Sequence, residues 1–452
     1  MNGIMTHTLT RRNLLKSAAA TAVGAGALPL LTQGLPAAAQ TRSRDAARLT
    51  YTTIAGTPEI PIFKHLGDQF NKTHRNAQAS FQLVPGTWED YNRKLVTQVA
   101  GGTVPDVTRA AIIYRPSYVS KGYVEDLMPF AQKSHFPFDQ YFKTPFGGYL
   151  VDNHLWGMPV GIYDMAMYYN KTMFKEAGIP FPSTNWEKGY DFDQFLSVAR
   201  KLTKGSGVHK QYGAQMLTDF RWLIHFLWWS GGEFLSADHS KCVLETPQAL
   251  EGLQYLHDLM FKYQVWPNPE TLKNGVLTTG LFTSGRVGMY LDGMWQMPTM
   301  KAIKNFEWGV APLPRNKKIA TGYYIDGWFV PKGAPNPELS WELIASFMSA
   351  QTEDYLAHQS DLGIPMLKST AQKDANLLFN PLPPNEQKVW LDSPNHGHQF
   401  PWTPNFADIQ QVLSRNLDLF ALQKTDVKQT ARNITQQVQP LLDKLTPAEK
   451  KA

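Results

Sequence analysis

Apolar and polar positions alternate along the chain in a way that predicts strands separated by amphipathic helices. Residues 49–54 and 80–84 are short β-prone runs, and residues 104–107 lead into a third strand. Between these runs apolar residues recur at helical spacing: Ile62, Phe63, Leu66 and Phe70, then Tyr91, Leu95 and Val99. This order predicts an α/β fold with parallel strands joined by crossover helices.

Further apolar stripes of helical period follow later in the chain, over residues 192–202, 250–260, 341–348 and 427–445. Each stripe predicts a helix with one face buried in a core.

Two extended segments interrupt this alternation, at residues 157–171 and 322–331. Each is β-prone and contains Pro or Gly, so each could carry the chain from one α/β unit into another. Two such crossings predict two lobes with interleaved chain and a hinge between them. We expect one lobe to comprise 48–158 plus 322–352, and the other 159–321 plus 353–447.

Residues 1–40 have the order of a cleavable export signal. Arg11 and Arg12 precede a mild apolar stretch at 18–31, and small residues follow at 37–39. Residues 10–16 resemble the twin-arginine motif, so we expect export of the folded protein to the periplasm or cell exterior. A disordered basic N-terminus is the alternative. The single cysteine, Cys242, is far from the expected cleavage point, which argues against a lipid anchor there.

Composition excludes several classes of protein. The chain has 452 residues with 44 Lys and Arg against 38 Asp and Glu, and the export segment holds three of the basic residues. This balance is too weak for nucleic-acid binding, which needs a concentrated basic face. One cysteine excludes an internal disulfide framework and a thiolate metal cluster. No run beyond the export segment reaches the roughly 18 apolar residues of a membrane helix.

Motifs for catalysis or cofactors are absent from the sequence. It has no phosphate-binding Gly-rich loop with Lys, no Gly-x-Ser-x-Gly turn and no His-Glu-x-x-His helix. His396 and His398 form the closest histidine pair, without a nearby carboxylate or cysteine to complete a metal site. We therefore expect no cofactor, no metal and no catalysis.

Aromatic residues are unusually frequent, with 13 Trp, 18 Tyr and 24 Phe. Several lie beside turn residues and polar groups, at 219–222, 292–295, 326–328 and 401–404. A pyranose ring has an apolar face and a hydroxyl rim, so its site needs a flat aromatic partner with polar groups at the edge. This pattern favours a carbohydrate site, and the alternative places these rings in the core or in lobe contacts.

Five segments resemble, in order, one known family. Residues 99–107, 159–171, 282–295, 306–314 and 362–369 are similar to motifs of the extracellular solute-binding proteins of sugar ABC importers, the group of maltose-binding protein. The resemblance implies a type II periplasmic-binding-protein fold, an interlobe cleft that closes on a mono- or oligosaccharide, and delivery to ABC transporter permease subunits. It also implies a monomer that makes and breaks no bond.

The resemblance also implies a set of ligand-binding residues. Trp295 would stack on a sugar ring, and Tyr163 would face the cleft at the first crossing. The remaining candidates are Asp292, Arg221, Trp222, Asp326, Trp328, Trp402, Phe406, Thr57 and Arg109. Tyr163 stands where the family has a carboxylate contact, so maltose itself is not inferred.

Three other functions remain open. Glycerol-3-phosphate or another anionic solute would use the same fold, with Arg109, Arg221 and Arg286 as candidate partners of the anion. An exported carbohydrate-active enzyme would turn over an oligosaccharide. An exported interaction or sensory module would associate with a receptor in a ligand-dependent manner.

Overall fold

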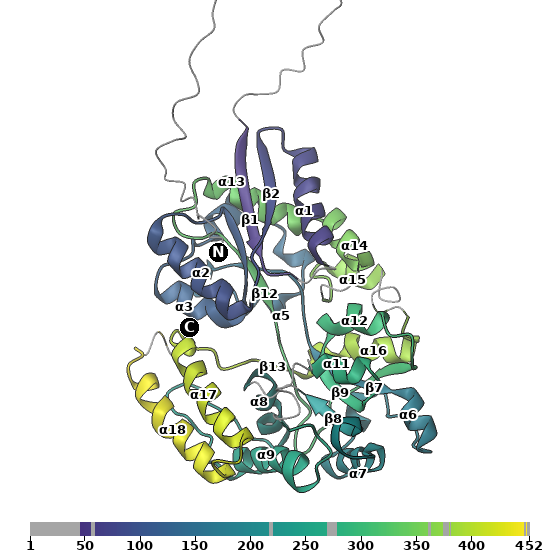
Figure 1. Ribbon diagram of the computed structural model, residues 1–452. Coiled ribbons are helices and arrows are strands. Elements are labelled where there is room, and N and C mark those ends of the chain that lie inside the picture. The colour runs from purple at the N-terminus through teal and green to yellow at the C-terminus, as the bar shows by residue number, and fades with distance from the viewer. Residues whose placement is uncertain are drawn as a thin grey trace, which may run out of the picture. The chain divides into compact units, whose positions relative to one another are not determined.

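Two mixed sheets form the framework of the chain (Figure 1). The structure is a computed structural model that describes residues 46–55, 59–216, 220–268, 278–359, 363–373, 379, 381–446 and 449. These residues belong to one unit from Asp45 to Ala452. The predicted export segment 1–40 lies outside the described residues.

The first sheet has five strands in the order β2-β1-β3-β12-β6. Their bounds are Ala77–Leu83 (β2), Ala47–Thr53 (β1), Val107–Ala111 (β3), Asp326–Phe329 (β12) and Met158–Pro159 (β6). β1 runs parallel to β2 and β3, which confirms the predicted crossover pattern. β12 lies antiparallel between β3 and β6.

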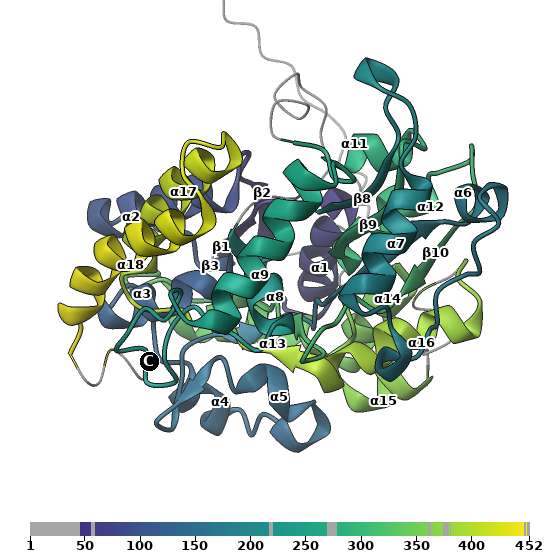
Figure 2. The same ribbon diagram turned by 90° about the horizontal axis from the view of Figure 1, so that it is seen from below.

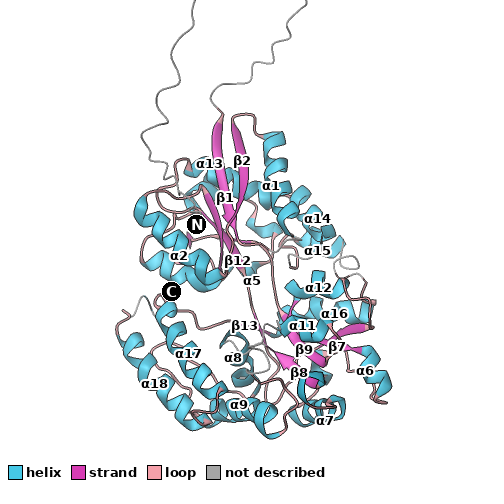
Figure 3. Cartoon of the chain, viewed as in Figure 1, coloured by secondary structure: helices cyan, strands magenta, loops and turns pink. Residues whose placement is uncertain are grey.

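The second sheet has four strands in the order β10-β7-β9-β8. Their bounds are Trp308–Ala311 (β10), Met165–Asn170 (β7), Val287–Gly293 (β9) and Tyr212–Met216 (β8). β7 is antiparallel to both neighbours, whereas β8 and β9 are parallel. Every residue of β7 and β9 is buried, because helices cover both faces of this sheet. Figure 3 shows these helices around the strands.

The chain leaves the first sheet after β6, builds the second sheet from β7 to β10 and returns at β12. The two predicted crossings, 157–171 and 322–331, contain these transitions, which confirms a two-lobed architecture with interleaved chain. A third passage is marked by a small parallel pair, β11 (Thr321–Gly322) with β13 (Gly397–His398). β4 (Leu150–Val151) and β5 (His154–Leu155) form a separate hairpin.

Helices connect and cover the strands. The longer helices are α1 (Ile60–Thr73), α2 (Trp88–Gly101), α7 (Phe192–Leu202), α8 (Phe220–Trp229), α9 (Pro247–His257), α13 (Pro337–Phe347), α14 (Ala350–Gln359), α16 (Pro384–Asp392), α17 (Phe406–Ala421) and α18 (Val427–Asp443). The shorter ones are η2 (Ile112–Tyr114), α3 (Arg115–Ser120), α4 (Met128–Lys133), η3 (Phe138–Gln140), α5 (Lys143–Phe146), α6 (Lys171–Glu176), η4 (Trp186–Lys188), η5 (Gly207–His209), η6 (Asp258–Lys262), α11 (Thr278–Thr283), η7 (Met294–Gln296), α12 (Met297–Lys301), α15 (Lys368–Lys373) and η8 (Ser393–His396).

Local sequence signals fix where the main helices begin and end. Thr87 caps α2, and Asp90 completes a capping box with it, while Gly102 ends the helix in the left-handed conformation with φ 64°. Asp191 and Gln194 form the same capping box at the start of α7.

The predicted helical stripes face the core. In α1 the four predicted residues are all buried, and Tyr51 of β1 donates its hydroxyl to the Phe63 carbonyl at 2.6 Å. Gly67 permits this packing, because a Cβ there would lie 2.4 Å from the Tyr51 hydroxyl oxygen. α13 and α14 also contact α1, and α17 lies beside α18, as Figure 2 shows from below.

Among the described residues, no helix is long and apolar enough to cross a membrane.

Candidate functional site

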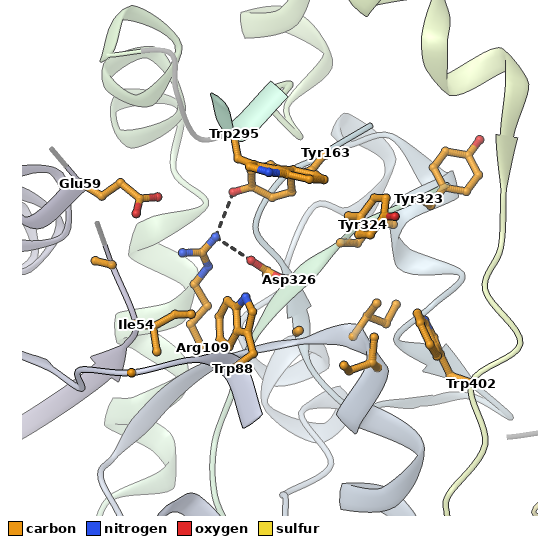
Figure 4. A pocket seen from close by; sticks show the side chains of 16 residues that line it. Ile54, Glu59, Trp88, Arg109, Tyr163, Trp295, Tyr323, Tyr324, Asp326 and Trp402 are labelled. Carbon is orange, nitrogen blue, oxygen red and sulfur yellow. Dashed lines mark hydrogen bonds and ion pairs between the residues drawn. The ribbon is translucent and has the colours of Figure 1, made fainter. Parts of the chain in front are cut away.

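A pocket of about 530 Å³ lies where the two crossings meet the ends of the sheets (Figure 4). Its lining combines six aromatic side chains, three charged side chains and aliphatic walls. The aromatic residues are Trp88, Tyr163, Trp295, Tyr323, Tyr324 and Trp402, the charged ones Glu59, Arg109 and Asp326, and the aliphatic ones Ile54, Ala55, Ala111, Ile112, Ile113 and Ile325, with Gly86 between them.

The topology explains this gathering of residues. Ile54 and Ala55 follow the carboxyl end of β1, and Ile112 follows that of β3. These strands are parallel, so their carboxyl ends lie at the same edge of the first sheet. Trp295 follows the carboxyl end of β9 in the second sheet. The pocket is therefore lined from both sheets.

Arg109 occupies one end of the pocket and ties the two crossings together. Its Nη2 donates to Asp326 Oδ2 at 2.7 Å and to the Tyr163 hydroxyl at 3.2 Å. Figure 4 shows both bonds. Tyr163 belongs to the first crossing and Asp326 to the second, so one buried guanidinium braces both.

The charges around Arg109 keep it protonated. Burial alone would lower the pKa of Arg109, but the hydrogen bond to the Tyr163 hydroxyl and the carboxylates of Asp326 and Glu59 outweigh burial and raise it above its ordinary value. Burial also raises the pKa of Tyr163, so this phenol is neutral and acts as a hydrogen-bonding group.

Two tryptophans flank this charged end of the pocket. Trp88 is the first residue of α2, and its ring lies 5.8 Å from the Arg109 guanidinium carbon. Trp295 is half-buried, and its ring folds back over the end of β9. Gly293 is needed for this fold, because a Cβ there would lie 2.1 Å from the Trp295 ring. Figure 4 shows the two indoles on opposite sides of Arg109.

Further rings form the other end of the pocket. Tyr324 meets Trp295 edge to face, with ring centroids 5.0 Å apart. Trp402 stacks on Phe400 at 4.6 Å with an interplanar angle of 10°. Phe400 in turn contacts Tyr324 at 4.8 Å, so the aromatic wall is continuous from Trp295 to Trp402.

The structure places five of the predicted site residues on this pocket: Arg109, Tyr163, Trp295, Asp326 and Trp402.

Three other predicted residues lie elsewhere, which corrects their expected position. Trp328 follows Asp326 on β12 by two residues, but it packs in the first-sheet core against Phe63 and Phe347 and is 1% exposed. Asp292 is buried on β9, where it accepts hydrogen bonds from the Gly293 backbone and Gln296. Phe406 is buried against Trp402 at 4.5 Å and so supports the wall from behind.

Thr57 lies outside the described residues, as do the side chains of Arg221 and Trp222 at the start of α8.

Sequence reasoning missed Trp88, Glu59, Tyr323 and Tyr324. The signal for Trp88 was present, since it directly follows Thr87 of the capping box at the end of a predicted strand-to-helix turn. Tyr323 and Tyr324 lie inside the second predicted crossing, beside residues that were singled out.

Within the described ranges, no three His, Cys, Asp or Glu side chains are placed to hold a metal ion. His396 stacks on Trp186 at 5.0 Å, and His398 Nε2 lies 3.2 Å from Glu233 Oε1. The two histidines therefore have separate surroundings. Cys242 is buried, as expected for a small apolar residue.

The two sheets, the interleaved crossings and the shared pocket define a two-lobed α/β binding protein. Comparison with known proteins agrees with this class. Residues 65–378 match the family described as bacterial extracellular solute-binding protein, and this match covers more than half of the chain. The chain therefore belongs to that family.

Individual relatives are distant. A protein of Brucella abortus described as a binding protein is 25% identical over 360 residues, which cover 76% of this chain and 82% of that protein. The maltodextrin-binding protein MdxE of Bacillus subtilis is 25% identical over 289 residues, 62% of this chain and 65% of that protein.

A solved structure has the same fold. An ABC substrate-binding protein from Listeria monocytogenes in complex with cycloalternan superposes with a TM-score of 0.80 at 20% identity, covering 88% of this chain and all of that chain.

Proposed function

We propose that this protein captures a carbohydrate in the pocket between its lobes and delivers it to the permease subunits of an ABC importer. The observation that carries the proposal is the pocket lining, in which six aromatic rings surround a polar cluster built on Arg109. Aromatic faces match the C–H faces of a pyranose, and the polar cluster matches its hydroxyl rim.

The polar cluster has hydrogen-bonding capacity to offer. The buried Nε of Arg109 has no hydrogen-bond partner among the described residues. A ligand oxygen that reaches it would satisfy a donor whose desolvation otherwise costs about 1–3 kcal/mol. The hydroxyl of Tyr324 and the indole N–H groups are further polar groups of lining residues.

The charges of the lining favour an uncharged sugar over an anionic solute. The described lining residues carry two carboxylates, Glu59 and Asp326, against one guanidinium, which already pairs with Asp326. A phosphate would want several convergent cations or backbone donors. The relatives support the same choice, because MdxE is a maltodextrin-binding protein and the Listeria protein was solved with cycloalternan.

The mechanism is a shift between open and closed lobes, without bond chemistry. A sugar contacts Trp88 and Arg109 on one side and Trp295 on the other, so it binds the closed arrangement better than the open one and shifts the population toward it. The closed arrangement is then presented to the permease, and reopening releases the sugar.

The proposal includes the remaining features of the sequence analysis. The protein acts as a monomer after twin-arginine export and cleavage near residue 40, without a lipid anchor at that point. One lobe comprises 48–158 plus 322–352 and the other 159–321 plus 353–447. The expected boundary at 352/353 divides α14, and the contacts of α14 with α1 favour moving this boundary to the end of α14, so that the first lobe extends to residue 359.

Tryptophan fluorescence titrated with mono- and oligosaccharides and with glycerol-3-phosphate tests the proposal, because three indoles line the pocket. We expect saturable quenching or enhancement with at least one sugar and none with glycerol-3-phosphate. Phe181→Ala is a suitable control, since Phe181 is 45% exposed and does not line the pocket. If the protein binds glycerol-3-phosphate and no sugar, the pocket is a site for anionic solutes. If the purified protein turns over an oligosaccharide, it is an enzyme and the proposed binding function is wrong.

A further inference from the structure

Asp164 is a buried carboxyl group at the junction between the pocket and the second sheet. It follows Tyr163 of the pocket and precedes β7, and its side chain is fully buried. Its Oδ2 lies 2.7 Å from Ser393 Oγ, at the start of η8. Its Oδ1 has no hydrogen-bond partner in the described part of the chain.

The hydrogen bonds of the Ser393 hydroxyl indicate whether Asp164 is protonated. Ser393 Oγ lies 2.7 Å from Asp164 Oδ2 and 2.8 Å from the Trp390 carbonyl oxygen, yet a serine hydroxyl has one proton to donate. Both contacts are hydrogen bonds at the same time only when Asp164 carries a proton and donates it to Ser393. An ionised Asp164 would also bury a charged oxygen without a partner, which is costly.

Burial acts in the same direction. It raises the pKa of Asp164 to about 7, although the Ser393 hydrogen bond opposes the shift. The Asp164 carboxyl group therefore titrates near neutral pH, whereas an exposed aspartate is ionised throughout this range.

Asp164 lies where three segments that carry pocket residues meet. Thr321 Oγ1 accepts from the Met165 backbone N–H and donates to the Met165 carbonyl, both at 3.0 Å, which joins the second crossing to the first. The hydroxyl of Tyr323 donates to the Pro394 carbonyl beside Ser393. The chain then continues through β13, which pairs with β11, to Trp402. Tyr163, Tyr323 and Trp402 thus depend on one junction.

Few ionisable groups surround this junction. The titratable side chains on the elements packed against it are Tyr323 beside β11, Asp292 on β9, Asp392 and His396 at η8, His398 on β13 and His225 on α8. The Asp164 charge raises the pKa of Tyr323, with burial as the larger cause, so this phenol is neutral near pH 7. No cation among the described groups contributes to the pKa of Asp164.

We propose that Asp164 is a positioning residue whose protonated form leaves the Ser393 hydroxyl on the Trp390 carbonyl, and that loss of the Asp164 proton draws this hydroxyl onto the carboxylate, loosens the aromatic wall and weakens solute binding. The inference rests on the proposed binding function. It makes capture of the solute pH-dependent through a residue that does not touch the solute.

The test is the dissociation constant of the sugar found in the fluorescence titration, measured from pH 5.5 to 8.5. If only the protonated form positions the wall, affinity falls about tenfold between pH 6 and pH 8. Asp164→Asn is expected to abolish this step, because its amide donates to Ser393 at every pH. Ser393→Ala removes the hydroxyl that links Asp164 to the Trp390 carbonyl, so it is also expected to abolish the affinity step.

Glu353→Gln is the matched control. Glu353 is a second buried carboxyl group, with its pKa raised to about 8 by burial, but it accepts from the Met366 backbone and is not on the pocket. We expect Glu353→Gln to retain the affinity step. A wild-type affinity that is flat across neutral pH, or a step that survives Asp164→Asn, would overturn the inference.

A measurement without ligand separates this inference from the proposed function. Because the pKa of Asp164 is raised on folding, wild-type stability from this group declines as pH rises from about 4 to about 7. Urea unfolding should show that Asp164→Asn gains stability relative to wild type at pH 8 and loses that gain at pH 4. If Asp164→Asn does not fold, the infrared carbonyl band of protonated carboxyl groups reports the same proton in wild type and in Ser393→Ala. A wild-type band that is the same at pH 6 and at pH 8 would refute the titration of Asp164 in this range.

Discussion

The ion pair between Arg109 and Asp326 should be one of the most costly single interactions to break in this protein. The two side chains are 5% and 17% exposed, and their closest atoms are 2.7 Å apart. Removing one partner of a buried pair leaves an uncompensated charge and costs about 3–5 kcal/mol. Because Asp326 retains some contact with water and Glu59 also stabilises the Arg109 charge, we place Asp326→Asn near 3 kcal/mol, at the low end of that range.

The assay is urea unfolding of the single variants Asp326→Asn and Arg109→Met and of the double variant. The double variant should recover about 2 kcal/mol relative to the sum of the singles, since neither charge is then left alone. The control is Glu307→Gln, which breaks the exposed Lys175–Glu307 pair, with side chains 57% and 66% exposed. Such an exposed pair contributes little to stability, because water and salt screen it. An Asp326→Asn loss no larger than that of the control would refute the brace at the two crossings.

Three further predictions concern other parts of the chain. Trp295→Ala should weaken sugar binding at least tenfold with little change in thermal melting, and an unchanged affinity would remove the stacking role of Trp295. Trp328→Ala should instead destabilise the fold by about 3–5 kcal/mol, because the Trp328 ring lies in the core. Gly67→Ala should cost about 1–3 kcal/mol in urea unfolding, since the added methyl overlaps the phenol packed on α1, and a neutral result would show that α1 can shift freely. Replacing Arg11 and Arg12 by Lys should abolish export in a fractionation assay, and unimpaired export would contradict a twin-arginine route.

The repeating part of the fold could be predicted from the sequence because its signals are local. The strand at 49–54, the stripe in α1 and the parallel order of β1 to β3 depend on periodicity and on short connections. The antiparallel insertion of β12 could not be predicted this way. It pairs residues about 217 positions apart, such as Ala110 and Gly327, and no local pattern encodes such a pairing.

The site was predicted in part for the same reason. Trp295 and Tyr163 lie in segments with family-like motifs, so their approximate position followed from the resemblance. Trp328 shows the limit of that reasoning: residues two positions apart in a strand share a face, yet Asp326 lines the pocket and Trp328 is in the core. The two residues differ in their position along β12. Asp326 is the first residue of the strand, whereas Trp328 lies further in and is covered by Phe63 and Phe347.

The late return of β12 to the first sheet has a consequence for biosynthesis. Until residue 329 has left the ribosome, β3 and β6 lack the strand that separates and pairs them, and each exposes an open edge of the kind that promotes aggregation. A nascent chain interrupted before that point, such as a product of premature termination, therefore cannot complete even its N-terminal lobe. Completion of the first sheet therefore waits until residue 329 has been made, and products truncated before it should depend on chaperones or be degraded.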